Sequence, residues 1–282
     1  MAAAGRTILV TGATDGLGRA VAERLARDGA TVLLHGRDRG RLDEVAAGIG
    51  SATGGDAPRT YQADLADLAE VRALAGEVRD TTDLLHVLVN NAGVGSGEPD
   101  GRERRTSADG YELRFAVNYL AGFLLTLELL PLLIASAPAR VVNVASLGQA
   151  PIDFDDVMLE RGYSGDRAYG QSKLAQIMFG FELADRLDPE RVTVNSLHPG
   201  TFMPTKMVIR ERGASVDELE TGIESTTWLA AASELDAVTG RFYDRQREAR
   251  ADAQAYEEAA RVRLWQLSVD LTGAPDAFAG SR

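Results

Sequence analysis

The sequence predicts an α/β fold in which helices cover both faces of a doubly wound parallel sheet. Short apolar segments rich in β-branched residues alternate with segments of helical periodicity between residues 7 and 197. The apolar segments lack the polar alternation of half-exposed strands, which is typical of parallel strands buried on both faces. The 282 residues show no linker, composition break or internal repeat, so we expect a single domain over residues 1–282.

Strand, turn and helix open the chain. Thr7 begins a β-branched run to residue 10, and a glycine-rich turn follows. Leu17, Val21 and Leu25 then recur at helical spacing until Gly29 ends the pattern. The same signals place the next elements in order: a strand over 31–34, an arginine-rich helix from 39, a polar glycine-rich stretch at 48–59, a strand near 60–62 and a helix over 65–75.

The second half of the chain continues the alternation with more apolar segments. They place a strand over 84–89, a long helix over 112–134, a strand over 140–145, a helix over 168–187 and a strand over 192–197. Two stretches interrupt this order: 93–110, which is rich in glycine and charge, and 201–233, which follows a Pro-Gly corner. Irregular insertions at the carboxyl ends of parallel strands are where such folds bind ligands.

Composition excludes several classes of function. The 30 Lys and Arg residues face 42 Asp and Glu residues, and the net charge of −12 repels polyanions, so no nucleic-acid partner is expected. Zero cysteines exclude thiol nucleophiles and iron-sulfur clusters, and three scattered histidines predict no metal site. The sequence has no run of eighteen apolar residues and residues 1–6 are too short for a secretory leader, so we expect a cytoplasmic protein without a membrane partner.

The glycine-rich turn has the context of a dinucleotide site. Gly12, Gly16 and Gly18 follow a strand and open a helix, so bare backbone can approach a pyrophosphate while the helix N-terminus offers amide hydrogens. The spacing is Gly-x-x-x-Gly-x-Gly, and a tight strand-to-helix turn without a ligand is the alternative. The turn indicates a Rossmann-type arrangement.

A tyrosine and a lysine stand four residues apart, at Tyr169 and Lys173. At this spacing the two side chains lie on one face of a helix. An ammonium beside a phenol favours the phenolate, which suits the phenol to transfer protons. Only two of the basic residues are lysines, and arginine at this position would be bulkier and permanently charged. A tyrosine that merely packs on its helix is the alternative.

The order and spacing of these motifs over residues 7–200 resemble the short-chain dehydrogenase/reductase family. The resemblance rests on the glycine turn, Asn90-Asn-Ala-Gly93, Asn118, Ser146, the tyrosine and lysine, and Pro199-Gly200. It extends to the retinol-dehydrogenase-like branch through blocks such as Phe115-Ala-Val-Asn-Tyr-Leu120, Phe154-Asp-Asp156 and Val194-Asn-Ser-Leu-His-Pro-Gly200.

The resemblance implies a catalytic set of four residues. Tyr169 is the general acid/base, and Lys173 tunes it and anchors a ribose. Ser146 polarises the substrate carbonyl, unless it only caps the next turn. Asn118 holds a kink and a water that passes protons, unless it is a satisfied core amide.

Cofactor contacts are implied at the carboxyl ends of the strands. Asp64 contacts adenine in the family, and it equally resembles the N-cap of the helix predicted at 65–75. The complete expected set is Gly12, Thr14, Asp15, Gly16, Leu17, Gly18, Arg37, Arg41, Asp64, Leu65, Asn91, Ala92, Gly93, Tyr169, Lys173, Pro199, Gly200 and Thr201.

The second strand predicts NADP(H) in preference to NAD(H). Gly36 stands where NAD users of the family carry an acid, and Arg37 and Arg41 are expected to meet a 2′-phosphate. Asp15 departs from this pattern, because some NADP users have a basic or small polar residue there. Solvated charge at a helix end is the alternative for the arginines.

The substrate side is less specific. Met203 stands where the branch usually places a threonine, with Thr201 and Thr205 on either side. Phe202, Met207, Val208 and Ile209 complete an apolar loop that favours a hydrophobic substrate. Insertions on this side are expected near 93–110, 148–167 and 201–233. The residues 261–271 resemble the branch's closing helix, with Val262, Trp265, Val269 and Leu271 packing on the body or on a partner.

The resulting hypothesis is an NAD(P)-dependent oxidoreductase that interconverts a carbonyl and an alcohol by hydride transfer. Its partner is a small-molecule carbonyl or alcohol, and a homodimer or homotetramer stays open. A catalytically silent NADP-binding regulator or scaffold is the alternative from another class. A sugar-nucleotide epimerase shares the tyrosine and lysine, but it would more naturally have a Gly-x-x-Gly-x-x-Gly turn and a longer C-terminal substrate domain.

Overall fold

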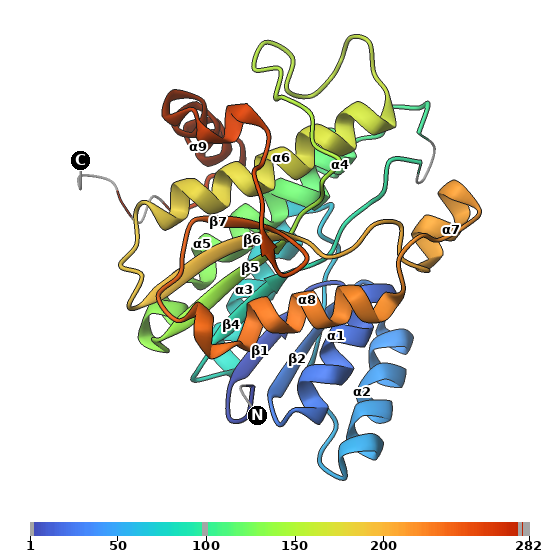
Figure 1. The fold of residues 1–282 in the computed structure, drawn as a ribbon, viewed down its shortest axis with the longest axis vertical. Coiled ribbons are helices and arrows are strands. Elements are labelled where there is room, and N and C mark those ends of the chain that lie inside the picture. The colour runs from blue at the N-terminus through green and yellow to red at the C-terminus, as the bar shows by residue number, and fades with distance from the viewer. Residues whose placement is uncertain (1–2, 98–100, 276–277, 279–282) are drawn as a thin grey trace.

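The computed structural model describes residues 3–97, 101–275 and 278, which form a Rossmann-type α/β fold around one sheet (Figure 1). The strand order is β3-β2-β1-β4-β5-β6-β7-β8, and all neighbouring strands are parallel except β7 and β8. The predicted fold class is confirmed. The strands are β1 Thr7–Val10, β2 Thr31–Gly36, β3 Thr60–Gln62, β4 Val87–Asn90, β5 Ala139–Val144, β6 Val192–His198, β7 Arg241–Asp244 and β8 Arg247–Glu248.

Helices cover both faces of the sheet and enclose two apolar cores. One face carries α1 Gly16–Arg27, α2 Arg39–Thr53 and α8 Leu219–Ala231, which lie in front of the sheet in Figure 1. The other face carries α3 Leu68–Thr81, α4 Leu113–Phe115, α5 Ala121–Ala135, α6 Gly165–Ala184 and α9 Glu258–Thr272. The chain order of the strands reverses between β1 and β4, and a crevice for ligands opens at such a reversal.

The long helix predicted at 112–134 is interrupted by a π-helical turn. Residues Ala116–Leu120 form this turn between α4 and α5, with Asn118 at its centre. Single π turns inside helices occur mostly at functional sites. The segment Leu113–Ala135 is long and apolar enough to span a membrane, but 67% of its most apolar window is buried inside the protein. It serves here as the core helix beneath the sheet.

The start of α3 differs from the predicted one, and strands β7 and β8 were not predicted. Helix α3 begins at Leu68 because the side chain of Asp67 accepts hydrogen bonds from the amides of Ala69 and Glu70. The expectation that Asp64 caps this helix is therefore wrong; its side chain accepts from Ala66 N within the preceding turn. Strands β7 and β8 escaped prediction because both are short and four of their six residues are charged.

The stretches expected to be irregular are partly helical and partly core. Within 201–233 lie a short helix, α7 (Lys206–Arg212), and the whole of α8, which covers the sheet. Within 148–167, buried Ile152 and Val157 pack into the core on the α6 side. Two 3-10 turns, Ser233–Leu235 and Ala253–Tyr256, join the remaining elements. Of the stretch 93–110, residues 98–100 lie outside the described part.

Helix α9 packs against α5 and α6. Trp265 stacks on Phe179 and meets Phe123 edge-on, with ring centroids 6.1 and 5.3 Å apart. Aromatic pairs at these distances stabilise by more than their buried area alone. Of the four apolar positions predicted to pack, Trp265 is fully buried, while Leu264, which was not predicted, is buried beside it. The closing helix therefore packs on the body of the same chain.

Candidate active site

A single cavity of about 1450 Å³ runs along the carboxyl ends of the strands. The glycine turn and the β2 arginines line one end, and Ser146, Tyr169 and Lys173 line the other. Every residue predicted for the site lines this cavity except Asn118, which lies beneath its wall. The space exceeds a typical small-ligand pocket, as a site for a dinucleotide and a substrate together must.

The glycine turn is fixed by backbone contacts with the end of β4. The Thr11 hydroxyl accepts from the amides of Asn91 and Ala92, and the Asn91 side chain donates to the Thr11 carbonyl. A Cβ at Gly18 would lie 2.3 Å from the Asn91 side chain, and Gly12 adopts φ +68°. The close packing therefore requires glycine at these positions, and the Asn91 side chain holds the turn in place by its hydrogen bond.

His35 supports the same turn from below, a role that the sequence did not reveal. Gly12 N donates to His35 Nδ1 at 3.3 Å, so Nε2 carries the proton and donates to the Ala63 carbonyl. Burial lowers the pKa of His35 to about 4. A neutral imidazole therefore holds the glycine turn at physiological pH.

The end of β2 presents two exposed arginines to the cavity. The Arg37 and Arg41 side chains are 70% and 56% exposed, and their nearest acids, Asp64 and Asp38, are each 3.9 Å away. Such loose, solvated pairs are weak, so the guanidinium groups are available to an anion. A Cβ at Gly36 would lie 2.4 Å from the Thr14 methyl, which leaves no space for an acid at that position.

The Tyr169 and Ser146 side chains lie close together in the cavity, because a Cβ at Gly148 would lie 3.4 Å from Ser146 Oγ and 3.8 Å from the Tyr169 ring. Tyr169 comes from the first turns of α6, and Ser146 follows β5, so the two hydroxyls face one another across the cavity. Ser146 Oγ also accepts from Gly148 N at 3.0 Å, so the alternative turn-capping role holds as well. Burial raises the pKa of Tyr169, and nearby Glu211 adds to the rise. The phenol is therefore protonated near neutrality.

Lys173 lies deeper than Tyr169 on the same face of α6. Its ammonium donates to the Val144 carbonyl at 2.8 Å and to Gln176 Oε1 at 3.2 Å, and it lies 5.8 Å from the centroid of the Tyr169 ring. Burial lowers the pKa of Lys173 to about 8. The side chain remains mostly cationic at pH 7 and is oriented by two acceptors.

Asn118 is fully engaged inside the wall. Its Oδ1 accepts from Val94 N at 2.7 Å, and its Nδ2 donates to the Val94 carbonyl and to Ser172 Oγ. A Cβ at Gly93 would lie 3.1 Å from Asn118 Oδ1 and 3.7 Å from Lys173 Nζ, so the amide and the ammonium flank the same glycine. The π turn places Asn118 where it pins the strand end that lines the cavity.

The loop after Pro199-Gly200 closes the cavity as a lid. Thr201 is held by Asp217, which accepts from its amide, and its hydroxyl meets His198 Nε2. Thr205 caps α7 by accepting from Val208 N, so its hydroxyl is already engaged. Phe202, Met203, Met207 and Val208 line the cavity, whereas Ile209 does not and is 45% exposed.

Two charged residues of α7 contact segments on the other side of the cavity, and the sequence analysis predicted neither of them. Lys206 Nζ lies 2.7 Å from Asp15 Oδ2 in the glycine turn. Glu211 Oε1 accepts from Gly97 N at 2.9 Å. For Lys206 a signal existed, because it is the second of only two lysines in the chain. The lid therefore contacts both the glycine turn and the segment that follows β4.

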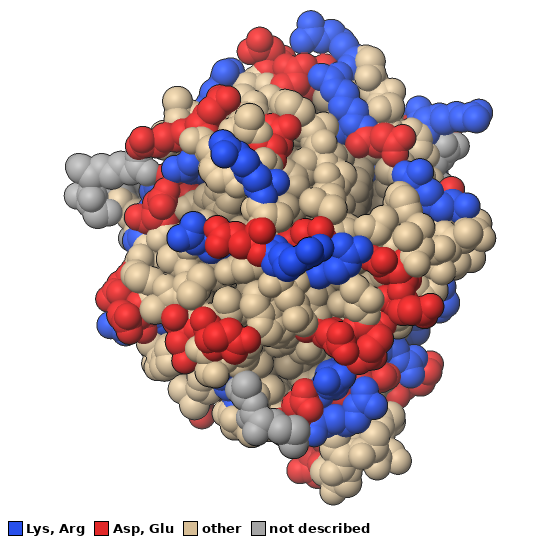
Figure 2. Space-filling model, viewed as in Figure 1, with Lys and Arg blue, Asp and Glu red and all other residues tan. Residues whose placement is uncertain are grey.

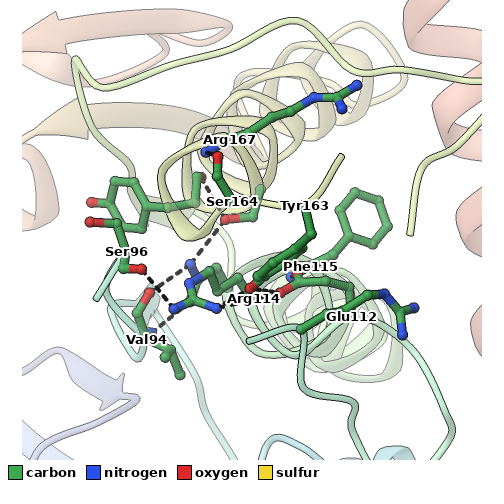
Figure 3. A network of polar contacts seen from close by, with 12 residues as sticks. Val94, Ser96, Glu112, Arg114, Phe115, Tyr163, Ser164 and Arg167 are labelled. Atoms are coloured by element: carbon green, nitrogen blue, oxygen red, sulfur yellow. Dashed lines mark hydrogen bonds and ion pairs between the residues drawn. The ribbon is translucent and has the colours of Figure 1, made fainter. Parts of the chain in front are cut away.

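A buried ionic network holds the segment after β4, which Glu211 contacts (Figure 3). Arg114 and Glu112 are fully buried at the start of α4, and their charges lie 3.6 Å apart. Arg114 donates to the carbonyls of Gly95 and Ser96 and to the hydroxyl of Tyr163, which in turn donates to Glu112. The network joins the segment after β4 to the segment that precedes α6.

The comparisons with known proteins decide the family. A family model described as short chain dehydrogenase matches residues 6–215, which is most of the chain. The chain belongs to the short-chain dehydrogenase family.

Two curated relatives place this short-chain dehydrogenase in the retinol-dehydrogenase-like branch. It is 36% identical to human retinol dehydrogenase 13 over 95% of this chain and 85% of that one. It is 38% identical to mouse polyprenol dehydrogenase over 96% of this chain and 84% of that one. A short chain dehydrogenase from Escherichia coli CFT073, solved as a complex with NADPH, matches with a TM-score of 0.68 and 30% identity over 86% of this chain and 97% of that one.

The short-chain dehydrogenase is accordingly an NAD(P)-dependent oxidoreductase that acts on CH-OH or C=O groups of small molecules. Its own residues fit a dinucleotide. The N-terminal turn of α1 lines the cavity, and a Cβ at Gly12 or Gly18 would clash with neighbouring backbone, so the turn is bare of side chains there. Two exposed guanidinium groups lie at the same end.

The lowered pKa of Lys173 predicts that the stability of the short-chain dehydrogenase depends on pH. Its pKa is about 8 in the folded chain against 10.5 ordinarily. Below pH 8 both states hold the proton, and the cost of the buried ammonium is fully present. Between pH 8 and 10 the folded state releases the proton while the unfolded state keeps it, so the free energy of unfolding should rise by about 2 to 3 kcal/mol.

Denaturant unfolding of the cofactor-free protein across this range measures the effect. Lys173→Met is the control, because it removes the titrating group while keeping an unbranched side chain. The wild type should gain stability relative to Lys173→Met as pH rises. Parallel curves for the two proteins would show that Lys173 titrates normally.

Proposed function

We propose that this chain transfers hydride reversibly between a nicotinamide cofactor and a carbonyl or alcohol, with Tyr169 as general acid/base. The juxtaposition of Tyr169, Ser146 and Lys173 in the cavity that the glycine turn also lines carries the proposal. When bound, the cofactor supplies or accepts the hydride. The reaction class follows from the family; the roles of the individual residues are inferred from their positions.

Ser146 and Tyr169 form a pair of donors for one substrate oxygen. Ser146 would align and polarise the carbonyl, and Tyr169 would deliver the proton, since its raised pKa keeps it protonated. Lys173 would stabilise the phenolate left behind, because its ammonium lies on the same helix face. Asn118 supports the wall beside Lys173, and we propose that a water there completes the proton path.

The preferred cofactor is proposed to be NADP(H). Arg37 and Arg41 are exposed at the end of β2, and Thr14 occupies the space that an acid at Gly36 would need. Asp64 and Leu65 line the adjoining part of the cavity, where the adenine would lie. A ribose 2′-phosphate suits this combination better than a free 2′-hydroxyl does.

Arg37→Ala tests this preference. We expect kcat/KM for NADPH to fall about 10- to 100-fold, because a charge-assisted hydrogen bond to phosphate is lost, while the value for NADH changes little. Steady-state kinetics with both cofactors measure the ratio. Arg19→Ala is the control, because Arg19 is an exposed arginine of α1 paired with Glu23. Equal losses with NADPH and NADH would contradict a 2′-phosphate contact.

A hydrophobic substrate of small to medium size is proposed. Phe202, Met203, Met207 and Val208 supply an apolar lid, and the methionine side chains can adapt to different shapes. The relatives' names, retinol and polyprenol dehydrogenase, agree with an apolar substrate class. A panel of aldehydes, ketones and secondary alcohols, followed by nicotinamide absorbance, tests the function. Silence across the panel with intact NADPH binding would favour a regulator.

The remaining proposals concern the domain organisation, cellular location, partners and assembly of the enzyme. We propose a single domain over residues 1–282 that works in the cytoplasm, without a nucleic-acid or membrane partner. Basic and acidic side chains are interspersed over the face drawn in Figure 2, and the net charge is −12. Assembly as a homodimer or homotetramer stays a prediction that a measurement of molar mass in solution would test.

A further inference from the structure

Asp15 occupies an unfavourable position for a protein that binds phosphates. Its carboxylate lines the cavity at the N-terminus of α1, where it accepts from Gly16 N at 2.8 Å. The partial positive charge of that helix end is the feature that attracts an anionic ligand. Asp15 therefore competes with the pyrophosphate for the same helix end and repels it.

Lys206 compensates this charge from the lid. It is the first residue of α7, and its Nζ lies 2.7 Å from Asp15 Oδ2. The neighbouring Thr205 lies directly over the turn, because a Cβ at Gly16 would meet its methyl at 3.2 Å. Both charged side chains remain partly open to the cavity, with Lys206 64% and Asp15 40% exposed.

We propose that Lys206 is a cofactor-binding residue: its ammonium cancels the charge of Asp15, so that the glycine turn accepts the phosphates of the dinucleotide beneath α7. This inference rests on the proposed function, because the ligand is the same nicotinamide dinucleotide. An exposed ion pair contributes little to folding. Here the pair would act in binding, because both residues line the cavity at the glycine turn, where the phosphates would be held.

The decisive measurement is how the substitutions at Asp15 and Lys206 combine in their effect on the Kd for NADPH. Lys206→Met should raise the Kd for NADPH about tenfold, since an uncompensated carboxylate then faces the phosphates. Asp15→Asn should leave the Kd unchanged or lower it, because asparagine still caps a helix without the charge. In the double variant nothing remains to compensate, so its Kd should match that of Asp15→Asn within about twofold.

Titration of NADPH fluorescence with each of the four proteins, in the absence of substrate, measures these constants. Arg24→Met is the matched control: it removes the ion pair between Arg24 of α1 and Glu220 of α8, and neither residue lines the cavity. Its Kd should equal that of the wild type. Thermal unfolding of the cofactor-free variants verifies that all of them are folded.

The outcomes separate this inference from the function on which it rests. Failure of the wild type to bind NADPH would overturn the proposed function. Normal binding by Lys206→Met would overturn the role of Lys206 alone. A double variant as weak as Lys206→Met would overturn charge compensation, because Lys206 would then act without Asp15.

Discussion

Tyr169→Phe is expected to lower kcat by about 100-fold or more while the Kd for NADPH changes by less than about threefold. The substitution removes only the hydroxyl that faces Ser146, so the ring and its packing on α6 remain. General acid/base groups contribute about 10²- to 10⁴-fold to turnover, which sets the size of the loss. Single-turnover hydride transfer, monitored at 340 nm, would measure the chemical step directly.

Tyr163→Phe is the matched control for this substitution. Tyr163 lies six residues earlier, does not line the cavity, and bonds to Arg114 and Glu112. Its turnover should stay within a few-fold of the wild type at a temperature where both proteins are folded. Near-normal turnover of Tyr169→Phe would remove Tyr169 from the chemistry and leave Ser146 as the proton source to test.

Arg114→Met is expected to destabilise the protein by about 3 to 5 kcal/mol, because it leaves the Glu112 carboxylate buried without its partner. It also leaves the carbonyls of Gly95 and Ser96 without the hydrogen bonds that they accept from Arg114. Urea unfolding at pH 7 measures the loss. Because those carbonyls belong to the rim that Glu211 contacts, the KM for substrate should rise as well.

Removing the charge of Glu112 distinguishes the cost of an unpaired buried charge from the cost of lost packing in this network. Arg114→Met combined with Glu112→Gln should recover part of the stability, since the buried charge is gone and the side chain can still accept from Phe115 N. Arg19→Met removes an exposed pair with Glu23 and should cost less than about 1 kcal/mol. A loss of that small size for Arg114→Met would contradict the importance assigned to the buried pair.

Local sequence signals predicted strands β1 to β6 and the residues that line the cavity at the glycine turn and on α6. Parallel strands buried on both faces are continuous apolar runs, and the glycine turn follows β1 directly, so topology brings the predicted residues to one sheet edge. Tyr169 and Lys173 share a helix, where spacing alone fixes which face they occupy. The fold class already determines the directions of the strands and helices that carry the motif residues. Their placement at one edge of the sheet could therefore be predicted.

The remaining contacts join segments that no local pattern connects. Lys206 meets Asp15, and Arg114 meets Tyr163, only because α7 and the segment before α6 fold back over the cavity. Phe202 of the apolar loop lines the cavity, but Ile209 turns outward because α7 is a helix with a solvent face. Asp64 resembled the N-cap of α3, but Asp67, three residues later, has the same carboxylate and caps the helix instead.

The scarcity of lysine makes the lid chemically addressable. Lys173 is 5% exposed, whereas the Lys206 side chain is 64% exposed, and the sequence contains no other lysine. An acylating reagent has Lys206 as its one accessible side-chain amine, and the amide it forms carries no charge. A dye attached there would report the position of α7, and bound dinucleotide should protect the amine from the reagent.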